Sequence, residues 1–356
     1  MNIDLQKIIS YSDNFIHVLK RHICRTLNVQ NDDIDLDEIP LKGGNIATIF
    51  RFRLDSKSYI VKYENKSVSS LSIIVNQIDL YQREYNFYEF ISKYVNVRIP
   101  EFISLLKDEQ YNNIGLILED LQTNPEHKFN LNLNQESIDV SLKIINEMTK
   151  LHCKFMNTDL SKRFKHLKKN NDSTFYPFFE NFLIQKIELF KNRWSNVLTS
   201  NQICRAVEIC MNFSTIQHRL SNTINCTLVH GDIKSPNICY TMDKSPIFLD
   251  WQHCVIGKGT QDLVFFIIES FDINTLDVVY PLFKNYYYKK LLENDQCHTR
   301  NYSIESYETD LKDAVCYIPF FTCLWFGTLD QDDLIDKNWP YFFIKKTFRL
   351  IDLIMN

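Results

Sequence analysis

Two short apolar segments, each followed at once by a polar loop, constrain the fold of this chain most. The first covers residues 227–229, and the loop after it reads HGDIKSPN. The second covers residues 247–249 and runs directly into Asp250. Short strands of this kind end at the edge of a small sheet, so their loops bring Asp232, Asn237 and Asp250 close together. The fold must therefore include a strand pair that carries three oxygen-bearing side chains.

These side chains are the minimum set for moving a phosphoryl group from ATP to an alcohol. Asp232 is the predicted general base, because a carboxylate free of metal can accept the hydroxyl proton. The amide of Asn237 and the carboxylate of Asp250 are hard oxygen ligands for Mg²⁺. Asp and Asn also serve turns alone, but glycine usage favours the catalytic interpretation. The chain has 7 glycines in 356 residues, against about 7% in average proteins, and Gly231 lies inside this loop.

With these motifs the chain resembles the aminoglycoside phosphotransferase and choline kinase superfamily, which has the protein-kinase-like fold. It is most similar to the ecdysteroid kinase-like branch, whose signature runs HGD-x4-N, DWQ and G-x4-DLA. Here the segments read HGDIKSPN, DWQ and GKGTQDLV, with Val264 in place of the final alanine. The likeness covers about residues 36–270. It implies a bilobal α+β fold, ATP and Mg²⁺ as cofactors, and a small molecule as phosphoryl acceptor.

The hydrophobic pattern predicts the same order of elements. Residues 5–27 have helical spacing, and 31–38 read as a solvated connector. Strands follow at 39–41, 46–54, 59–63, 101–106 and 113–118, with one helix at 71–94 between the third and the fourth. Beyond Asp120 the pattern is helical apart from the strand pair, with helices at 135–155, 175–198, 201–220, 260–271, 275–293, 305–326 and 340–355. The predicted domains are a leading helix and connector (1–35), a nucleotide-binding lobe (36–121), and a lobe with the catalytic loop and acceptor pocket (122–356).

Lys62 is the predicted phosphate-binding cation of the nucleotide-binding lobe. It lies on the third long strand, in IVKY, and its ammonium would neutralise the α- and β-phosphates. It needs a carboxylate partner on the next helix. The family pattern places a Glu shortly before an F-Y pair, and REYNFYEF fits it with Glu84, with Glu89 as the alternative.

Two further segments are predicted to contact the nucleotide. The backbone N–H groups of Gly43, Gly44 and Asn45 would cap the phosphates at the first strand turn. Where the family often has an Asn after this turn, the chain has Ala47. The resemblance also implies that residues 116–121, including Glu119 and Leu121, join the lobes and bind the adenine edge.

The catalytic loop offers one more functional candidate and one structural one. The spacing D-I-K-x-x-N matches that of protein kinases, in which the Lys contacts the γ-phosphate, so Lys234 is a predicted catalytic residue. A solvent-facing lysine is the alternative. Asp262, at a helix start, is expected to hydrogen-bond the backbone of the catalytic loop, and His230 is expected to hold the loop by packing.

The spacing after Asp250 favours a small acceptor over a protein. Twelve residues separate Asp250 from Asp262, where a protein kinase has a longer activation segment closed by A-P-E. The predicted pocket is walled by the helices after Thr260 and by residues 175–198. A protein kinase and a catalytically silent nucleotide-binding protein remain alternatives. The acidic residues 330–336 beside aromatic side chains either bind a cationic substrate or form a solvated loop.

Composition limits the partners and the compartment. The net charge of −4 argues against nucleic acid. Residues 1–15 have neither a signal-peptide core nor a membrane span, so we expect a cytoplasmic protein without membrane contact. The ten cysteines lack zinc-ligand spacing and read as free thiols in a reducing compartment. A monomer and a homodimer are both left open.

Overall fold

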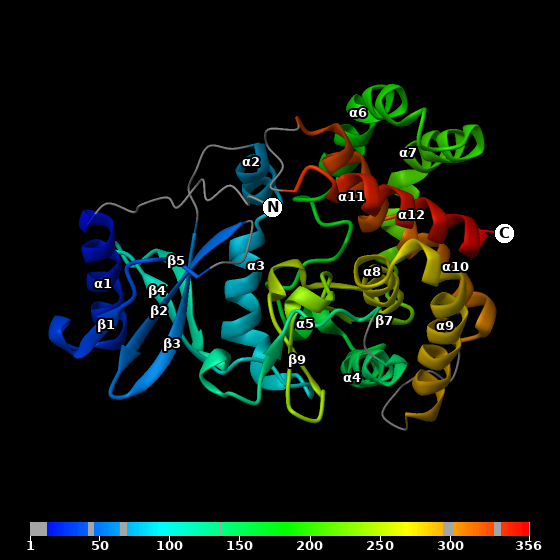
Figure 1. Ribbon diagram of the computed structural model, residues 1–356. Helices are drawn as coiled ribbons and strands as arrows, with labels where there is room; N and C mark the ends of the chain where they lie inside the picture. The colour runs from blue at the N-terminus through cyan, green and yellow to red at the C-terminus, as the bar shows by residue number, and fades with distance from the viewer. Residues whose placement is uncertain are drawn as a thin grey trace. The chain divides into compact units, whose positions relative to one another are not determined.

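The computed structural model describes residues 13–41, 46–64, 70–134, 137–294, 302–330 and 336–355. The chain divides into two compact units, Met1–Val75 with Pro100–Pro125, and Asn76–Ile99 with Glu126–Asn356. Each unit is described by itself (Figure 1). The predicted α+β class is confirmed, because the first unit contains a sheet and the second is mostly helical. Residues 76–99, which fall inside the predicted nucleotide-binding lobe, are grouped with the second unit.

The first unit is built on an antiparallel five-stranded sheet in the order β1-β2-β3-β5-β4. Its strands are β1 Ile34–Leu36, β2 Ala47–Leu54, β3 Lys57–Glu64, β4 Phe102–Lys107 and β5 Asn113–Glu119. A tight turn joins β2 to β3 through Asp55 and Ser56, both with positive φ. The long, fully paired β2–β3 hairpin therefore fixes the register of the centre of the sheet.

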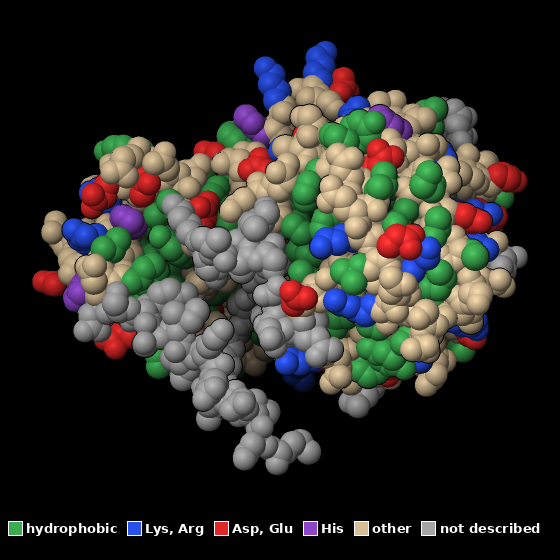
Figure 2. All heavy atoms as spheres, turned by 90° about the horizontal axis from the view of Figure 1, so that it is seen from above, with side chains coloured by type: hydrophobic (Ala, Val, Ile, Leu, Met, Phe, Trp, Pro, Cys, Tyr) green, Lys and Arg blue, Asp and Glu red, His purple; other side chains and the backbone are tan. Residues whose placement is uncertain are grey.

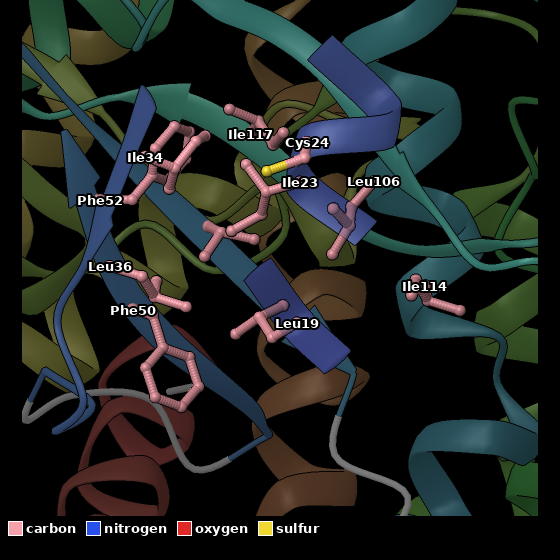
Figure 3. Close-up of a cluster of buried hydrophobic side chains, with 11 residues drawn as sticks. Leu19, Ile23, Cys24, Ile34, Leu36, Phe50, Phe52, Leu106, Ile114 and Ile117 are labelled. Atoms are coloured by element: carbon pink, nitrogen blue, oxygen red, sulfur yellow. The ribbon is translucent and has the colours of Figure 1, made fainter. Parts of the chain in front are cut away.

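Helix α1, Asp13–Leu27, packs its apolar stripe on this sheet. Leu19 and Ile23, one helical turn apart, are 1% and 0% exposed. They contact alternating strand residues such as Phe50 and Phe52 of β2 (Figure 3). Full burial of a large apolar side chain contributes about 1.5–3 kcal/mol. The leading helix is therefore an integral part of the first unit's core.

The predicted connector at residues 31–38 is wrong in part. Ile34 and Leu36 are buried and pair with β2, while Asp35 between them is exposed. This alternation is the period of a strand with one buried face. The predicted strand at 39–41 does not form, although Leu41 still donates a backbone hydrogen bond to Ile49.

The second unit carries two small sheets among its helices. Strand β7, Cys226–Val229, pairs antiparallel with β10, Val255–Lys258. A second sheet has the order β6-β8-β9, formed by Lys128–Phe129, Ile238–Tyr240 and Pro246–Phe248. The helices that follow residue 69 are α2 Ser70–Gln77, α3 Leu80–Asn86, α4 Ile138–Phe155, α5 Leu160–Arg163, α6 Phe178–Trp194, α7 Ser200–Leu220, α8 Thr260–Ser270, α9 Leu276–Glu293, α10 Ile304–Val315, α11 Ile318–Thr328 and α12 Trp339–Met355.

Two predicted long helices are broken in the structure. The helix at 71–94 stops after Gln77, and Asp79 adopts a left-handed conformation before α3 begins. The helix at 305–326 is interrupted at Cys316 and Tyr317, and α11 starts with Pro319 in its first turn. Proline is tolerated there because the first N–H groups of a helix have no partner within it.

Burial and charge agree with a chain that packs a large core. The nine described cysteines are all free, and all but Cys204 are buried, as predicted for thiols. Within the described ranges, no helix combines the length and apolarity that a membrane span requires. On the face drawn in Figure 2, acidic and basic side chains are interspersed over the second unit.

Candidate functional site

The strand pairs of the second unit bring the loop residues together. Ile238 of β8 lies opposite Phe248 of β9, and just outside this pair Leu249 donates a backbone hydrogen bond to the carbonyl of Asn237 (2.9 Å). Asn237 and Asp250 therefore lie at the same end of the sheet. Asp250 has a left-handed backbone (φ 63°), a conformation that Asp tolerates better than most residues.

The predicted base, Asp232, is the centre of a hydrogen-bonded cluster. It is 6% exposed. Its Oδ1 lies 2.9 Å from Lys234 Nζ, and its Oδ2 accepts a hydrogen bond from Asn237 Nδ2 at 2.8 Å. Asn237 Nδ2 also donates to the Asp232 carbonyl at 3.0 Å. The carboxylate is thus fixed from both sides, while the amide oxygen of Asn237 is left for another ligand.

Lys234 carries its charge on a partly buried side chain, which is 28% exposed. Burial by itself lowers the pKa of Lys234, but the negative charges of Asp232, Glu269 and Asp250 outweigh it and raise the pKa above its ordinary value. The ammonium therefore persists at every physiological pH. This ammonium contacts Asp232, while part of the side chain stays exposed, and the catalytic role of Lys234 stays a prediction.

The carboxylate of Asp262 holds the backbone of the catalytic loop, which confirms the predicted structural role of this residue. Its Oδ2 accepts a hydrogen bond from the N–H of His230 (2.9 Å), and its Oδ1 accepts one from Gly231 (2.7 Å). His152 Nε2 lies 3.0 Å from the same carboxylate, and His152 Nδ1 lies 2.7 Å from the hydroxyl of Tyr287. The buried carboxylate therefore connects the loop to α4 and α9.

His230 and Gly231 shape the loop in different ways. The N–H of Asp232 donates to His230 Nδ1, so the ring donates from Nε2 to the carbonyl of Leu249 (2.9 Å). Burial lowers the pKa of His230, so the ring is neutral. Gly231 has a φ of 85°, and a Cβ there would lie 2.4 Å from the carbonyl oxygen of His253. Only glycine fits this close approach.

His253 is a residue that sequence reasoning missed. It follows the DWQ motif directly and approaches Gly231. Burial lowers the pKa of His253 to about 4, with the charge of Arg83 acting in the same direction against those of Asp232 and Asp250. The ring, which belongs to a residue that is only partly exposed, is therefore neutral at pH 7.

This histidine makes the stability of the protein sensitive to acid. The folded pKa lies below the usual 6.5, so between these values the unfolded chain binds the extra proton. Stability is present above pH 6.5 and falls as the pH drops towards 4. When the pH is lowered from 6.5 to 5, the free energy of unfolding of wild type should fall by roughly 1–2 kcal/mol more than that of His253→Gln. Urea denaturation at both pH values measures this, with the exposed His166→Gln as control. Equal losses in wild type and His253→Gln would contradict it.

Glu269 was also missed. The burial of this side chain of α8 raises its pKa, and the nearby ammonium groups of Lys234 and Lys346 oppose that effect. Glu269 lies seven residues after Asp262, which is two turns of α8, so both carboxylates share one helix face. The seven-residue spacing from Asp262 was the sequence signal that could have identified Glu269. The face of α8 that holds the catalytic loop thus also supplies a charge partner for Lys234.

A mostly apolar cavity of about 60 Å³ adjoins the catalytic loop within the second unit. Gly231 and His253 form part of its wall, and the rest comes mainly from α8, from α11 and the residues just before it, and from the segment that leads into α6. Its aromatic lining residues are Phe175, Phe179, Phe265, Tyr317, Phe321 and Trp325. Residues of α6 and α8 were predicted to wall the acceptor pocket. Of the acidic stretch 330–336, residues 331–335 lie outside the described residues.

The predicted nucleotide-binding residues lie mainly in the first unit. Lys62 is in the middle of β3, opposite Ile49 and Leu116. It faces away from its buried neighbour Val61, because successive strand residues point to opposite sides. Gly43, Gly44 and Asn45 lie outside the described residues.

The last residues of β5 are fixed by local hydrogen bonds. Glu119 Oε2 accepts from the backbone of Glu101 (3.1 Å), and Leu121 is buried. Between them, Asp120 is almost fully buried and bonds Arg51 Nε at 2.6 Å. Burial raises its pKa, but the hydrogen bonds from Arg51 and other donors prevail and lower it. This ion pair, which the sequence did not predict, anchors the segment expected to bind adenine.

The two candidate partners of Lys62 differ in burial. Glu84 on α3 is 2% exposed, whereas Glu89 is exposed. Burial raises the pKa of Tyr88, and the charges of Glu84 and Asp250 raise it further, so both carboxylates lie near this ring. Lys62 and Glu84 belong to different units, and their pairing stays a prediction.

Solved structures with the same fold are small-molecule kinases by their names. An ethanolamine kinase of Plasmodium vivax is 13% identical, with a TM-score of 0.57, and the match covers 98% of this chain and 91% of that one. A choline kinase of Streptococcus pneumoniae is 13% identical, with a TM-score of 0.56 and coverage of 96% and 100%. Amicoumacin kinase, solved with AMP-PNP and Ca²⁺, is 11% identical, with a TM-score of 0.55 and coverage of 96% and 94%. At these identities the likeness shows the fold alone.

Sequence comparison gives the family. No curated protein matches the chain. The model of the ecdysteroid kinase-like family matches residues 50–298, well over half of the 356 residues, and confirms the predicted resemblance. The chain belongs to the ecdysteroid kinase-like family.

Proposed function

We propose that this protein is a kinase that uses ATP and Mg²⁺ to phosphorylate a hydroxyl group of a small molecule. The observation that carries the proposal is the cluster in which Lys234 and Asn237 hold both oxygens of the Asp232 carboxylate. A base fixed in this way can accept the hydroxyl proton as the alcohol attacks the γ-phosphate. Positioning and charge stabilisation are the main demands of phosphoryl transfer.

The residues around the base fit a divalent cation. Asn237 uses its nitrogen on Asp232, which leaves its amide oxygen as a hard ligand beside Asp250. The described residues hold no cluster of three or more His, Cys, Asp or Glu that could bind a metal by themselves. This agrees with Mg²⁺, which is usually held by one or two carboxylates together with substrate phosphates. Bound there, Mg²⁺ would neutralise charge on the phosphates.

The remaining nucleotide contacts are proposed from the sequence and the family. Lys62 would bind the α- and β-phosphates with Glu84 as its partner. Gly43, Gly44 and Asn45 would cap the phosphates, and Glu119 and Leu121 would flank the adenine. The AMP-PNP in the solved amicoumacin kinase supports a nucleotide as phosphoryl donor.

The segment after Asp250 supports a small acceptor. Its residues form the turn Trp251–His253 and then β10, which is fully paired with β7. Backbone in a ladder of this kind does not form the adjustable shelf on which a protein kinase docks a peptide. The named substrates of the solved relatives, ethanolamine, choline and amicoumacin, are small molecules as well.

A substrate panel tests this proposal directly. The purified protein is incubated with Mg-ATP and alcohols, amino alcohols, sterols, aminoglycosides and casein, and ADP release and phosphorylated products are measured. We expect one class of alcohol to be phosphorylated and casein to remain unmodified. Transfer to casein alone would support the protein-kinase alternative. Mg-ATP binding without any transfer would support a catalytically silent protein.

The metal site gives a second measurable consequence. Asn237→Ala and Asp250→Ala each delete an oxygen ligand, so we expect both to raise the Mg²⁺ concentration for half-maximal turnover by roughly 10-fold or more. The matched control is Asn212→Ala on α7, where the side chain bonds only the backbone of its own helix. Mg²⁺ titrations identical to wild type in both variants would place the metal elsewhere.

A further inference from the structure

The cavity beside the catalytic loop contains one buried cation. Arg83 lines it and is 6% exposed, and its guanidinium lies 4.8 Å above the ring of Phe175. Its Nη2 donates to the carbonyls of His253 (2.6 Å) and Cys254 (3.1 Å). No described carboxylate lies within ion-pair distance of Arg83. A buried charge without a counter-ion is costly, so such a group normally has a partner.

Two N–H donors of the wall have no hydrogen-bond partner among the described groups. One is Nε of Arg83. The other is the indole Nε1 of Trp325, a residue that is 7% exposed. Unsatisfied buried donors are rare in folded proteins and call for an explanation. Both side chains line the same cavity, so an oxygen-bearing ligand bound there is a candidate partner for these donors.

Three other polar side chains of the wall have partners nearby. Gln261 and Asn170 exchange side-chain hydrogen bonds, and Tyr317 donates to the backbone of Asn170. His253 is neutral at pH 7 because burial lowers its pKa to about 4. Among the described residues that line the cavity, Arg83 therefore carries the only formal charge.

We propose that the cavity is the acceptor site, and that the acceptor is an apolar alcohol with an anionic oxygen group, such as a carboxylate, bound by Arg83 and Trp325. This rests on the proposed phosphotransferase function. The apolar skeleton would pack on the aromatic wall, and the hydroxyl would lie at the end formed by Gly231, the residue before Asp232 in the chain. Charge-assisted hydrogen bonds from a guanidinium are about twice as strong as neutral ones.

The same wall disfavours cationic acceptors. Amino alcohols would place an ammonium group near an uncompensated guanidinium, in surroundings that screen charge poorly. The described cavity lining offers no carboxylate for such a group. The cavity should therefore favour an acceptor with a negative charge, whereas a site for choline or ethanolamine should favour a positive charge.

Matched sets of compounds test the proposal without requiring turnover. Branched aliphatic hydroxy acids of four to six carbons, chosen to suit a cavity of about 60 Å³, are compared with their primary amides and with the corresponding amines, which share the skeleton and hydroxyl but differ in charge. Binding is measured by calorimetry at pH 7 without nucleotide. We expect each acid to bind roughly 10-fold or more tightly than its amine, with the amide between them. Equal or tighter binding of the amines would overturn the proposal, as would failure of every acid to bind at millimolar concentration.

Variants of the two donors assign the preference to this cavity. Trp325→Phe keeps the ring but removes the N–H, and we expect acid binding to weaken roughly 5-fold. Arg83→Gln should abolish the preference for acids over amines. The controls are Trp194→Phe and Arg163→Gln. In wild type the indole of Trp194 donates to the carbonyl of Gly327, and Arg163 is exposed. If the controls weaken acid binding as much as Trp325→Phe does, the assignment is wrong.

The two proposals fail in different experiments. Absence of phosphoryl transfer to any alcohol contradicts the enzyme function, whereas the ranking of acids, amides and amines is still measured by binding. If Arg83→Gln does not fold, wild type and Trp325→Phe still decide the question.

Discussion

Asp232→Asn is expected to reduce turnover by roughly 10²–10⁴-fold, with ATP affinity little changed. The amide keeps the shape of the side chain but cannot accept the proton of the attacking hydroxyl. It also removes the negative charge beside Lys234, whose ammonium lies 2.9 Å from the carboxylate. The measurement is steady-state kinetics with the acceptor found in the substrate panel, together with calorimetry of Mg-ATP.

A matched control separates chemistry from a general effect of losing a carboxylate. Asp139 is exposed in the first turn of α4, outside the cluster, and Asp139→Asn should retain wild-type turnover. Near-normal turnover in Asp232→Asn would remove this residue from the mechanism. Loss of both turnover and nucleotide binding would indicate a structural role instead.

Asp262→Ala is expected to have the largest effect on stability, lowering the free energy of unfolding by about 3–5 kcal/mol. The carboxylate is fully buried and accepts hydrogen bonds from the N–H groups of His230 and Gly231, with His152 as a third partner. Alanine leaves these groups unpaired in a place that water does not reach. Buried groups that lose their partners are among the few causes of destabilisation this large.

Thermal and urea denaturation measure this change, and a surface ion pair provides the comparison. Asp277 bonds Arg349 on the protein surface, and Asp277→Ala should cost no more than about 1 kcal/mol. Asp262→Asn, which keeps one acceptor oxygen, should fall between the two. A cost for Asp262→Ala no larger than for Asp277→Ala would show that the loop does not depend on this carboxylate.

The sequence predicted the parts of the site that depend on local order. Asp232, Asn237 and Asp250 follow two strand-like segments, as predicted. The two segments do not pair with each other, however: β7, before Asp232, pairs with β10, and β9, before Asp250, pairs with β8 in a separate small sheet. Asp262 was identified because a carboxylate at a helix start commonly accepts backbone N–H groups. These inferences need only the pattern of a few neighbouring residues, and the family resemblance supplied the order of the larger elements.

The parts that were missed depend on contacts between distant segments. Arg83 bonds the carbonyl of His253, 170 residues away, and no local pattern indicates that pairing. Strand β1 was missed because Ile34 and Leu36 stand among acidic residues that read as a connector. The break before α11 was missed because apolar spacing continues through it, although Pro319 was a usable signal.

The arrangement around α8 has a consequence for how enzymes of this kind diversify. The helix holds the catalytic loop through Asp262 and faces the cavity with Phe265 one turn later. The described lining residues of the cavity do not include Asp232, Lys234, Asn237 or Asp250. If the cavity is the acceptor site, as proposed, substitution in the wall should alter which alcohol is accepted while the residues of the Asp232 cluster stay unchanged. A mutant library confined to the lining residues Phe179, Phe265, Phe321 and Thr322 would separate acceptor choice from the Asp232 cluster.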